Sequence, residues 1–201
     1  VFEKAIAFCN AGKNVSIKNV TINETHDYYA MWISAKGQTV NIDNLTVESA
    51  GRGIKIDEQY VDAPAKVTLT VKNSKFTTKK KAAILVKSEA GADITLSNVD
   101  IADAFDKVNA VWVDEDSKDY ADLVTVTGGS KAVEGQSVIV ADKPEDFANA
   151  ISKVEDGGTI MISSEVTMPY FNGKEINLVG TNENAIVKQS PADHLSTKYE
   201  G

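Results

Sequence analysis

The sequence predicts an all-β fold, a parallel β-helix in which coils of about 25 residues stack on one another. Two observations support this prediction. A strand-like unit that ends in asparagine recurs four times between Val15 and Val113. Each copy is followed by a second short apolar segment with a period of two. Such repeats bury little surface alone, so stacking one coil on the next is what gives them a continuous core.

The first repeated unit alternates apolar and polar residues, reaches an asparagine, and then continues with a short second stretch. The four copies are Val15–Ile22, Val40–Val47, Leu69–Phe76 and Ile94–Ile101. Their asparagines, Asn19, Asn44, Asn73 and Asn98, are separated by 25, 29 and 25 residues. Parallel stacking would place these side chains about 4.8 Å apart, close enough for amides to hydrogen-bond along the stack. We therefore expect an asparagine ladder, with asparagine also tolerating the left-handed backbone of a turn.

The second repeated unit consists of a small residue followed by apolar residues at alternate positions. Its copies are Ala30–Ile33, Gly53–Ile56, Ala83–Val86 and Ala110–Val113. A period of two predicts strands, with Met31 and Ile33 and their equivalents Ile54, Ile56, Ile84, Val86, Val111 and Val113 facing inward. The same period turns Trp32, Lys55, Leu85 and Trp112 outward. Ala5–Phe8 fits the register of this unit, and Leu123–Val126 begins one more rung.

These repeats resemble the right-handed parallel β-helix of the pectin-lyase-like superfamily, with its inside asparagine ladder. The likeness covers about residues 1–127. In character the chain is closest to the adhesin-like β-helix proteins of bacterial surfaces. The resemblance implies an extracellular or cell-surface location, although the first eight residues do not form a signal peptide.

The sequence pattern changes after a polar linker, which predicts two parts: 1–135, the β-helix coils, and 136–201. A helix is expected over Asp142–Val154, with Pro144 near its first position. Short strands are expected at Thr159–Ile162, Val166–Met168, Glu175–Gly180 and Ala185–Val187. This order resembles the capping helix and first coil of a pectin-lyase-like β-helix. It is either the start of a second β-helix unit, which we favour, or a cap that folds back on the first.

The charge and composition narrow the classes of partner. The formal net charge of −8 disfavours nucleic acid, because binding phosphates requires clustered lysine and arginine. No apolar run approaches the roughly 20 residues of a transmembrane helix. The single cysteine, Cys9, allows no intramolecular disulfide and supplies no thiolate set for zinc. No cofactor is expected.

Calcium is the one metal for which the sequence offers candidate ligands. The acidic loop Asp114–Asp122 contains Asp114, Asp116 and Asp119, and calcium binds through six to eight oxygens. The loop lacks the spacing of an EF-hand, so solvation of the loop is the competing interpretation.

No catalytic signature of the superfamily is present. Its lyases commonly use an arginine or lysine as the base, and Arg52 is the only arginine in this chain. It lies between Gly51 and Gly53, where a solvated turn residue is the simpler interpretation. The adjacent acids that a hydrolase would need have neither histidine near them in the sequence.

Two groups of side chains are candidates for ligand binding. His26, Tyr28 and Tyr29 form a loop with a titratable ring and two aromatic residues, suited to stacking on a sugar or contacting a protein. Trp32, Leu85 and Trp112 form what we call the outer stripe, which marks an interface if it is exposed. The alternative is that loops, or residues 137–201, cover the outer stripe.

We therefore expect a non-catalytic surface module that binds a polysaccharide or a protein. Two alternatives stay open: a lyase or hydrolase acting on acidic polysaccharide, and a structural spike or fibre component. The oligomeric state is not readable from the sequence.

Overall fold

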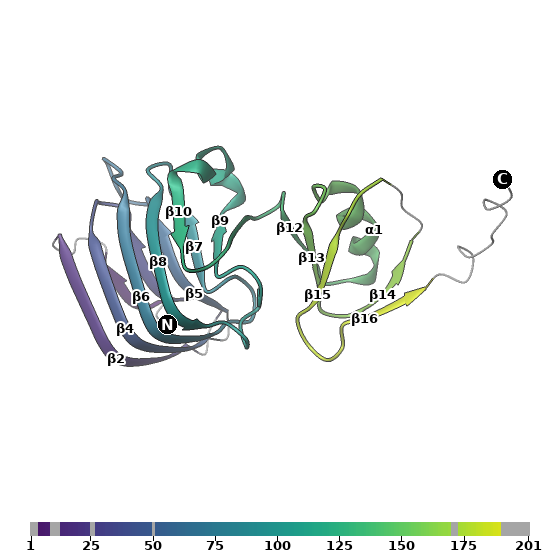
Figure 1. Ribbon diagram of the computed structural model, residues 1–201, viewed down its shortest axis with the longest axis horizontal. Coiled ribbons are helices and arrows are strands. Elements are labelled where there is room, and N and C mark those ends of the chain that lie inside the picture. The colour runs from purple at the N-terminus through teal and green to yellow at the C-terminus, as the bar shows by residue number, and fades with distance from the viewer. Residues whose placement is uncertain (1–3, 9–12, 25–26, 50, 170–172, 190–201) are drawn as a thin grey trace, which may run out of the picture. The chain divides into compact units, whose positions relative to one another are not determined.

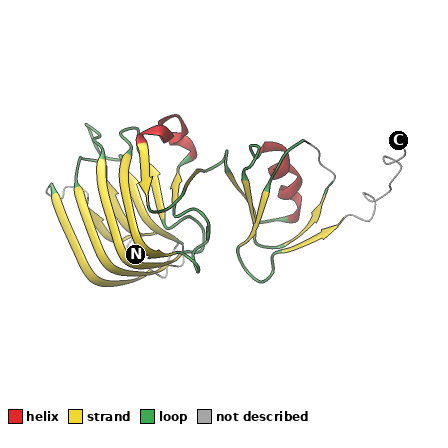
Figure 2. Ribbon diagram, viewed as in Figure 1, coloured by secondary structure: helices red, strands yellow, loops and turns green. Residues whose placement is uncertain are grey.

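The computed structural model describes residues 4–8, 13–24, 27–49, 51–169 and 173–189. The chain divides into two compact units, Val1–Val133 and Glu134–Gly201, and we describe each by itself. The described part of the chain is predominantly β-strand, and every pairing between its strands is parallel (Figures 1 and 2). No helix in the described part of the chain has the length and apolar character of a membrane span.

The first unit contains two parallel sheets, and the chain visits them alternately. One sheet has the order β1 (Lys4–Phe8), β3 (Tyr29–Ser34), β5 (Arg52–Asp57), β7 (Ile84–Lys87), β9 (Val111–Val113) and β11 (Lys131–Val133). The other has the order β10 (Val124–Thr127), β8 (Ala92–Asp100), β6 (Val67–Thr77), β4 (Thr39–Ser49) and β2 (Asn14–Glu24). Each return to a sheet adds the next strand, an arrangement compatible with a β-helix-like fold.

The core of the first unit lies between these two sheets. The predicted inward positions, Met31, Ile33, Ile54, Ile56, Ile84, Val86, Val111 and Val113, are all buried. They pack against apolar residues of the longer strands, among them Val40, Leu69 and Phe76. The period-two prediction for the short strands is therefore confirmed, because one set of alternate side chains fills the interior.

The four asparagines align as predicted, but their side chains are exposed rather than inside. Each has a positive φ, between 49° and 59°, and lies at a bend of its long strand. The ladder is also discontinuous. Asn44 donates to Asn19 at 2.9 Å and Asn98 donates to Asn73 at 3.0 Å, whereas Asn73 donates to Asp43.

The second unit contains one helix and two small parallel sheets. The elements are β12 (Val138–Ala141), α1 (Pro144–Lys153), β13 (Thr159–Ile162), β14 (Glu165–Met168), β15 (Asn177–Gly180) and β16 (Ile186–Gln189). The sheets have the orders β12-β13-β15 and β14-β16. Lys143 precedes α1, Pro144 occupies its first turn, and Phe147 and Ile151 enter a core with Ile160. The predicted helix and short strands are thus present.

A candidate ligand-binding groove

A groove of about 480 Å³ lies where strands β5 and β7 end, beside the 3₁₀ helix η1 (Glu115–Leu123). In a parallel sheet the carboxyl ends of all strands share one edge, so outward and terminal side chains from successive coils meet there. The lining residues are Lys55, Asp57, Glu58, Gln59, Lys87, Glu89, Asp116 and Ser117. All are polar, which makes the groove rich in hydrogen-bonding groups.

The residues that follow β5 are held by their own hydrogen bonds. The buried Asp57 carboxylate forms an ion pair with Lys55 and accepts a hydrogen bond from the Gln59 amide at 2.7 Å. Glu58 accepts hydrogen bonds from the Ser88 hydroxyl and from the Glu89 amide at 2.8 Å. These contacts join the ends of β5 and β7, so this part of the groove is preorganised.

Lys87 organises the side of the groove next to η1. Its ammonium forms ion pairs with Asp116 and, at 3.4 Å, with Asp114. The hydrogen bond to Asp116 raises the pKa of Lys87 and lowers the pKa of the Asp116 carboxyl. Farther along η1, the Glu89 carboxylate raises the pKa of Tyr120.

Two of the three predicted calcium ligands, Asp114 and Asp116, therefore share a lysine. The third, Asp119, lies within η1 and lines no part of the groove. Among the described residues no three His, Cys, Asp or Glu side chains form a group able to hold a metal ion.

Tyr60 is the most exposed large side chain beside the groove, with 81% of its surface accessible. Its ring centroid lies 6.4 Å from that of Trp32, over which the Lys55 ammonium is held at 5.1 Å. Its φ of 66° is a left-handed conformation that is unfavourable for a bulky residue. Strain of this kind, of order 1–3 kcal/mol, is concentrated at functional sites.

The outer stripe is not an exposed platform, which corrects one of our two expectations for it. Trp32, Leu85 and Trp112 point outward from the sheet, but they are 8%, 1% and 0% accessible. Tyr60 covers part of Trp32, and Phe105 meets Trp112 edge-to-face at 6.2 Å. Loops between the strands therefore cover the stripe, because leaving such rings in water is unfavourable.

The loop over Trp112 is fastened by Asp106, whose side chain is fully buried. Its carboxylate accepts hydrogen bonds from the indole nitrogen of Trp112 at 2.6 Å and from the backbone amides of Val108 and Asn109 at 2.8 Å. The Asn109 side chain adds a fourth at 3.1 Å. A buried carboxylate is stable only when it is this well satisfied.

The remaining candidates lie at the opposite end of the short strands. Arg52 begins β5, and its guanidinium carbon lies 5.1 Å from the centroid of the Tyr29 ring. Burial raises the pKa of Tyr29 to about 12, so its hydroxyl stays protonated at neutral pH. Tyr28 is partly exposed, and His26 falls outside the described residues.

The structure thus does not gather the predicted ligand-binding residues into one site. The Lys55 ammonium, which lines the groove, lies 5.1 Å from the centroid of the Trp32 ring and 5.3 Å from that of the Tyr29 ring, so it connects two of the predicted residues. Leu85 and Trp112 do not line the groove. Sequence reasoning considered Glu58 only as one of the adjacent acids that a hydrolase would need, and it missed Tyr60, Gln59, Lys87 and Glu89. One feature of the sequence indicated this region. The spacing from Asn44 to Asn73 is 29 residues, four more than the other two spacings between repeat asparagines, and the longer loop contains Tyr60.

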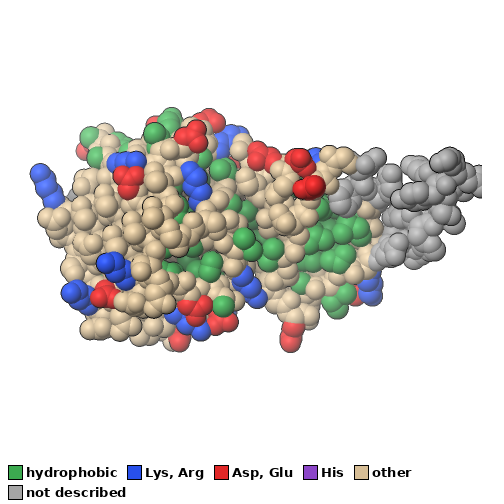
Figure 3. Space-filling view, viewed as in Figure 1, with side chains coloured by type: hydrophobic (Ala, Val, Ile, Leu, Met, Phe, Trp, Pro, Cys, Tyr) green, Lys and Arg blue, Asp and Glu red, His purple; other side chains and the backbone are tan. Residues whose placement is uncertain are grey.

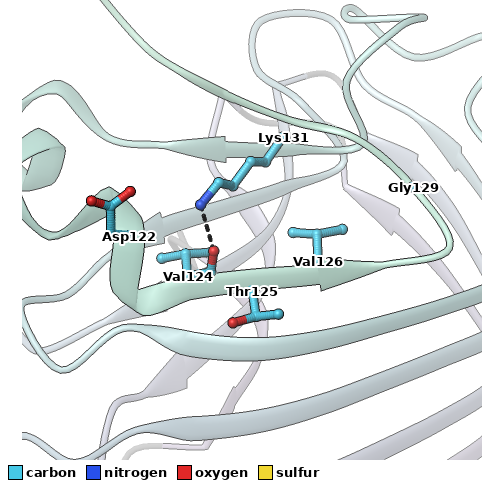
Figure 4. A pocket seen from close by; sticks show the side chains of 6 residues that line it. All are labelled: Asp122, Val124, Thr125, Val126, Gly129 and Lys131. Atoms are coloured by element: carbon cyan, nitrogen blue, oxygen red, sulfur yellow. Dashed lines mark hydrogen bonds between the residues drawn. The ribbon is translucent and has the colours of Figure 1, made fainter.

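A second hollow, of about 430 Å³, lies along β10 and the start of β11 (Figure 4). It is lined by Asp122, Val124, Thr125, Val126, Gly129 and Lys131. The Lys131 ammonium donates to the carbonyl oxygens of Ala121 and Val124, each at 2.6 Å. Because the lysine is engaged with the backbone, we interpret this hollow as the protected end of the sheet.

The formal charge of the groove disfavours an anionic ligand. Two lysines (Lys55 and Lys87) and four acids (Asp57, Glu58, Glu89 and Asp116) leave it with a formal charge of 2 − 4 = −2. On the face of the first unit seen in Figure 3, charged side chains of both signs are scattered and form no single-sign patch. Nothing described in the groove would attract a polyanion over distance.

Comparisons of this chain with protein-family models, with curated proteins and with solved structures found no match.

Proposed function

We propose that this chain is a non-catalytic module that binds a glycan in the groove beside Tyr60. The observation that carries the proposal is an exposed tyrosine, held in a left-handed conformation, at a preorganised groove lined by polar side chains. Sugars present apolar C–H faces and many hydroxyls, so a ring for stacking and a dense set of hydrogen-bonding groups suit them. The formal charge of −2 supports a neutral glycan over an acidic one.

The fold that we propose for the first unit is a right-handed parallel β-helix like that of the pectin-lyase-like superfamily. Support comes from the alternation between two parallel sheets and from the asparagines aligned at the strand bends. The proposal extends to an adhesin-like role at a cell surface or outside the cell. A stack of coils suits this role, because it presents loops of successive coils along one side.

The test is glycan binding by the chain and by Tyr60→Ala, first on an array of neutral and acidic oligosaccharides and then by calorimetry. We expect a neutral oligosaccharide to bind and Tyr60→Ala to weaken its binding about 5- to 10-fold, the scale of a lost aromatic contact. The matched control is Val108→Ala, which trims an exposed side chain in the loop over Trp112, whereas Tyr60 directly follows Glu58 and Gln59, which line the groove.

Three results would contradict the proposal: no binding on the array, equal binding by Tyr60→Ala, or preference for polyuronides. Release of unsaturated sugars that absorb in the ultraviolet would show instead that the chain is a lyase.

A further inference from the structure

The outer face of the five-stranded sheet carries a regular array of short polar side chains. Its strands β2, β4, β6, β8 and β10 lie side by side (Figure 1), and in the first half of each strand apolar residues point inward while the residues between them point outward. The strand register aligns these outward residues in two rows across the sheet. One row is Asn14, Thr39, Thr68, Asp93 and Thr125, and the other is Ser16, Asn41, Thr70, Thr95 and Thr127. We call these ten residues the polar array.

The composition of the polar array differs from that of the rest of this face. Nine of its ten residues are uncharged, and six of them are threonines. The exception, Asp93, forms an ion pair with Lys66 at 2.7 Å. The next row along the strands contains Lys18, Asp43 and Lys72, which are charged. The polar array is therefore a distinct patch with a nearly uncharged, hydroxyl-rich surface.

The hydroxyl groups of the polar array are available to a ligand. All ten residues are at least partly accessible to solvent. Within the described part of the chain, the side chains of Thr70, Thr95 and Thr127 form no hydrogen bond with another residue. Each hydroxyl can donate one hydrogen bond and accept two, and the branched Cβ of threonine restricts its rotamers. The array thus presents donors and acceptors at nearly fixed positions.

The geometry of the polar array suits a partner that is itself periodic. Sites for small molecules are concave, whereas of the ten residues only Thr125 lines the groove or the second hollow. Neighbouring strands lie about 4.8 Å apart, and residues two apart on one strand are separated by about 6.6 Å. A partner that contacts the whole array must offer hydrogen-bonding groups at similar intervals in both directions.

The oxygen lattice of ice offers hydrogen-bonding groups at similar intervals. Each water oxygen has four neighbours at about 2.75 Å in tetrahedral directions, so second neighbours lie about 4.5 Å apart. This interval is about 0.3 Å shorter than the strand spacing, which gives a mismatch of about 1.2 Å over the four steps between five strands. Along its hexagonal axis the lattice repeats every eight thirds of the O–O distance, about 7.3 Å, compared with about 6.6 Å between the two rows. Waters bound to the array can therefore lie close to lattice positions.

We propose that the polar array binds ice. Water molecules that bridge the threonine hydroxyls to the crystal hold the chain on the ice surface. The bound chain blocks the addition of water beneath it, which lowers the freezing temperature of the crystal without changing its melting temperature. This activity is independent of glycan binding, because the polar array and the groove share no residue and belong to different sheets.

The first test measures thermal hysteresis, the gap between the melting and freezing temperatures of a single ice crystal, in solutions of the whole chain. We expect a measurable gap and faceted crystals. Thr70→Lys places a long charged side chain on β6, the middle strand of the array, and should remove most of the hysteresis. The matched control is Thr77→Lys, which makes the same change at a partly accessible position of the same strand outside the array and should keep the hysteresis. Circular dichroism shows whether each variant is folded.

A second measurement needs no variant. The fluorescently labelled wild-type chain should accumulate on the surface of a growing ice crystal. A chain that is excluded from ice and shows no hysteresis at millimolar concentration would overturn the proposal, as would equal hysteresis in folded Thr70→Lys and Thr77→Lys. Retention on insoluble cellulose or chitin that Thr70→Lys abolishes, without hysteresis in the wild-type chain, would also overturn it and show that the array recognises a crystalline polysaccharide.

Discussion

At the scale of single residues, backbone conformation explains why the asparagines recur. Asn19, Asn44, Asn73 and Asn98 share a left-handed φ at the bend of a long strand, whereas only two side-chain hydrogen bonds join them to one another. Asparagine is one of the few residues other than glycine that adopts this conformation readily. All four asparagines are therefore explained by the left-handed bend. The side-chain hydrogen bonds of the ladder form only between some of them.

Asn44 allows this explanation to be tested. Asn44→Ala should lower the free energy of unfolding by about 1–2 kcal/mol, because alanine is disfavoured in the left-handed region. Asn44→Gly loses the same side-chain hydrogen bond to Asn19 but keeps the permitted φ, so it should cost less. Urea unfolding of both variants measures the difference. If the two variants were equally destabilised, the hydrogen bond would matter more than the bend.

At the scale of elements, the loops decide which outward side chains meet solvent. The alternation of residues in the short strands correctly predicted that Trp32 and Trp112 point outward from the sheet. It carried no information on whether Phe105 and Tyr60 would return over them, since those residues belong to irregular segments of the sequence. Burial of the outer stripe depends on these long-range contacts and on the Asp106 hydrogen bonds.

Removal of the Asp106 carboxylate should release the loop over Trp112. In Asp106→Ala the buried N–H groups that donate to this carboxylate lose their hydrogen-bond acceptor. We therefore expect the free energy of unfolding to fall by about 3 kcal/mol. Tryptophan fluorescence should shift to the red and become easier to quench as Trp112 meets water. The control is Asp103→Ala in the same loop, which removes only an exposed ion pair with Lys75 and should change little. Unchanged fluorescence in Asp106→Ala would show that another contact holds the loop.

At the scale of the whole molecule, the chain contains two separate cores. The cluster of the first unit runs from Ile17 to Val124, and that of the second from Ala141 to Val166. No residue belongs to both clusters, and the second is much the smaller. Burial of apolar area supplies most of the stability of a folded unit. We therefore expect each unit to fold and unfold independently, stabilised by its own cluster.

Expression of residues 1–133 alone should therefore give a folded protein. Its circular dichroism should show the β-structure of the first unit, and its thermal midpoint should lie within about 3 °C of the higher transition of the full chain, a difference of order 1 kcal/mol. The full chain should show a second, lower transition from residues 134–201. A single transition shared by the full chain, or an unfolded fragment, would contradict this independence.

The sequence by itself determined the parallel stacking of strands, the inward residues, the bends at asparagine and the helix at Pro144. These features depend on the strand period of two residues, on the helix period of about 3.6 and on a repeat spacing of about 25, which are properties of the chain read along its length. Only the tertiary structure decided that the asparagines face solvent, that loops cover Trp32 and Trp112, and that Tyr60 stands beside a groove. Those outcomes depend on contacts between residues of different coils, such as Lys87 with Asp116, and no local period encodes which distant side chains will meet.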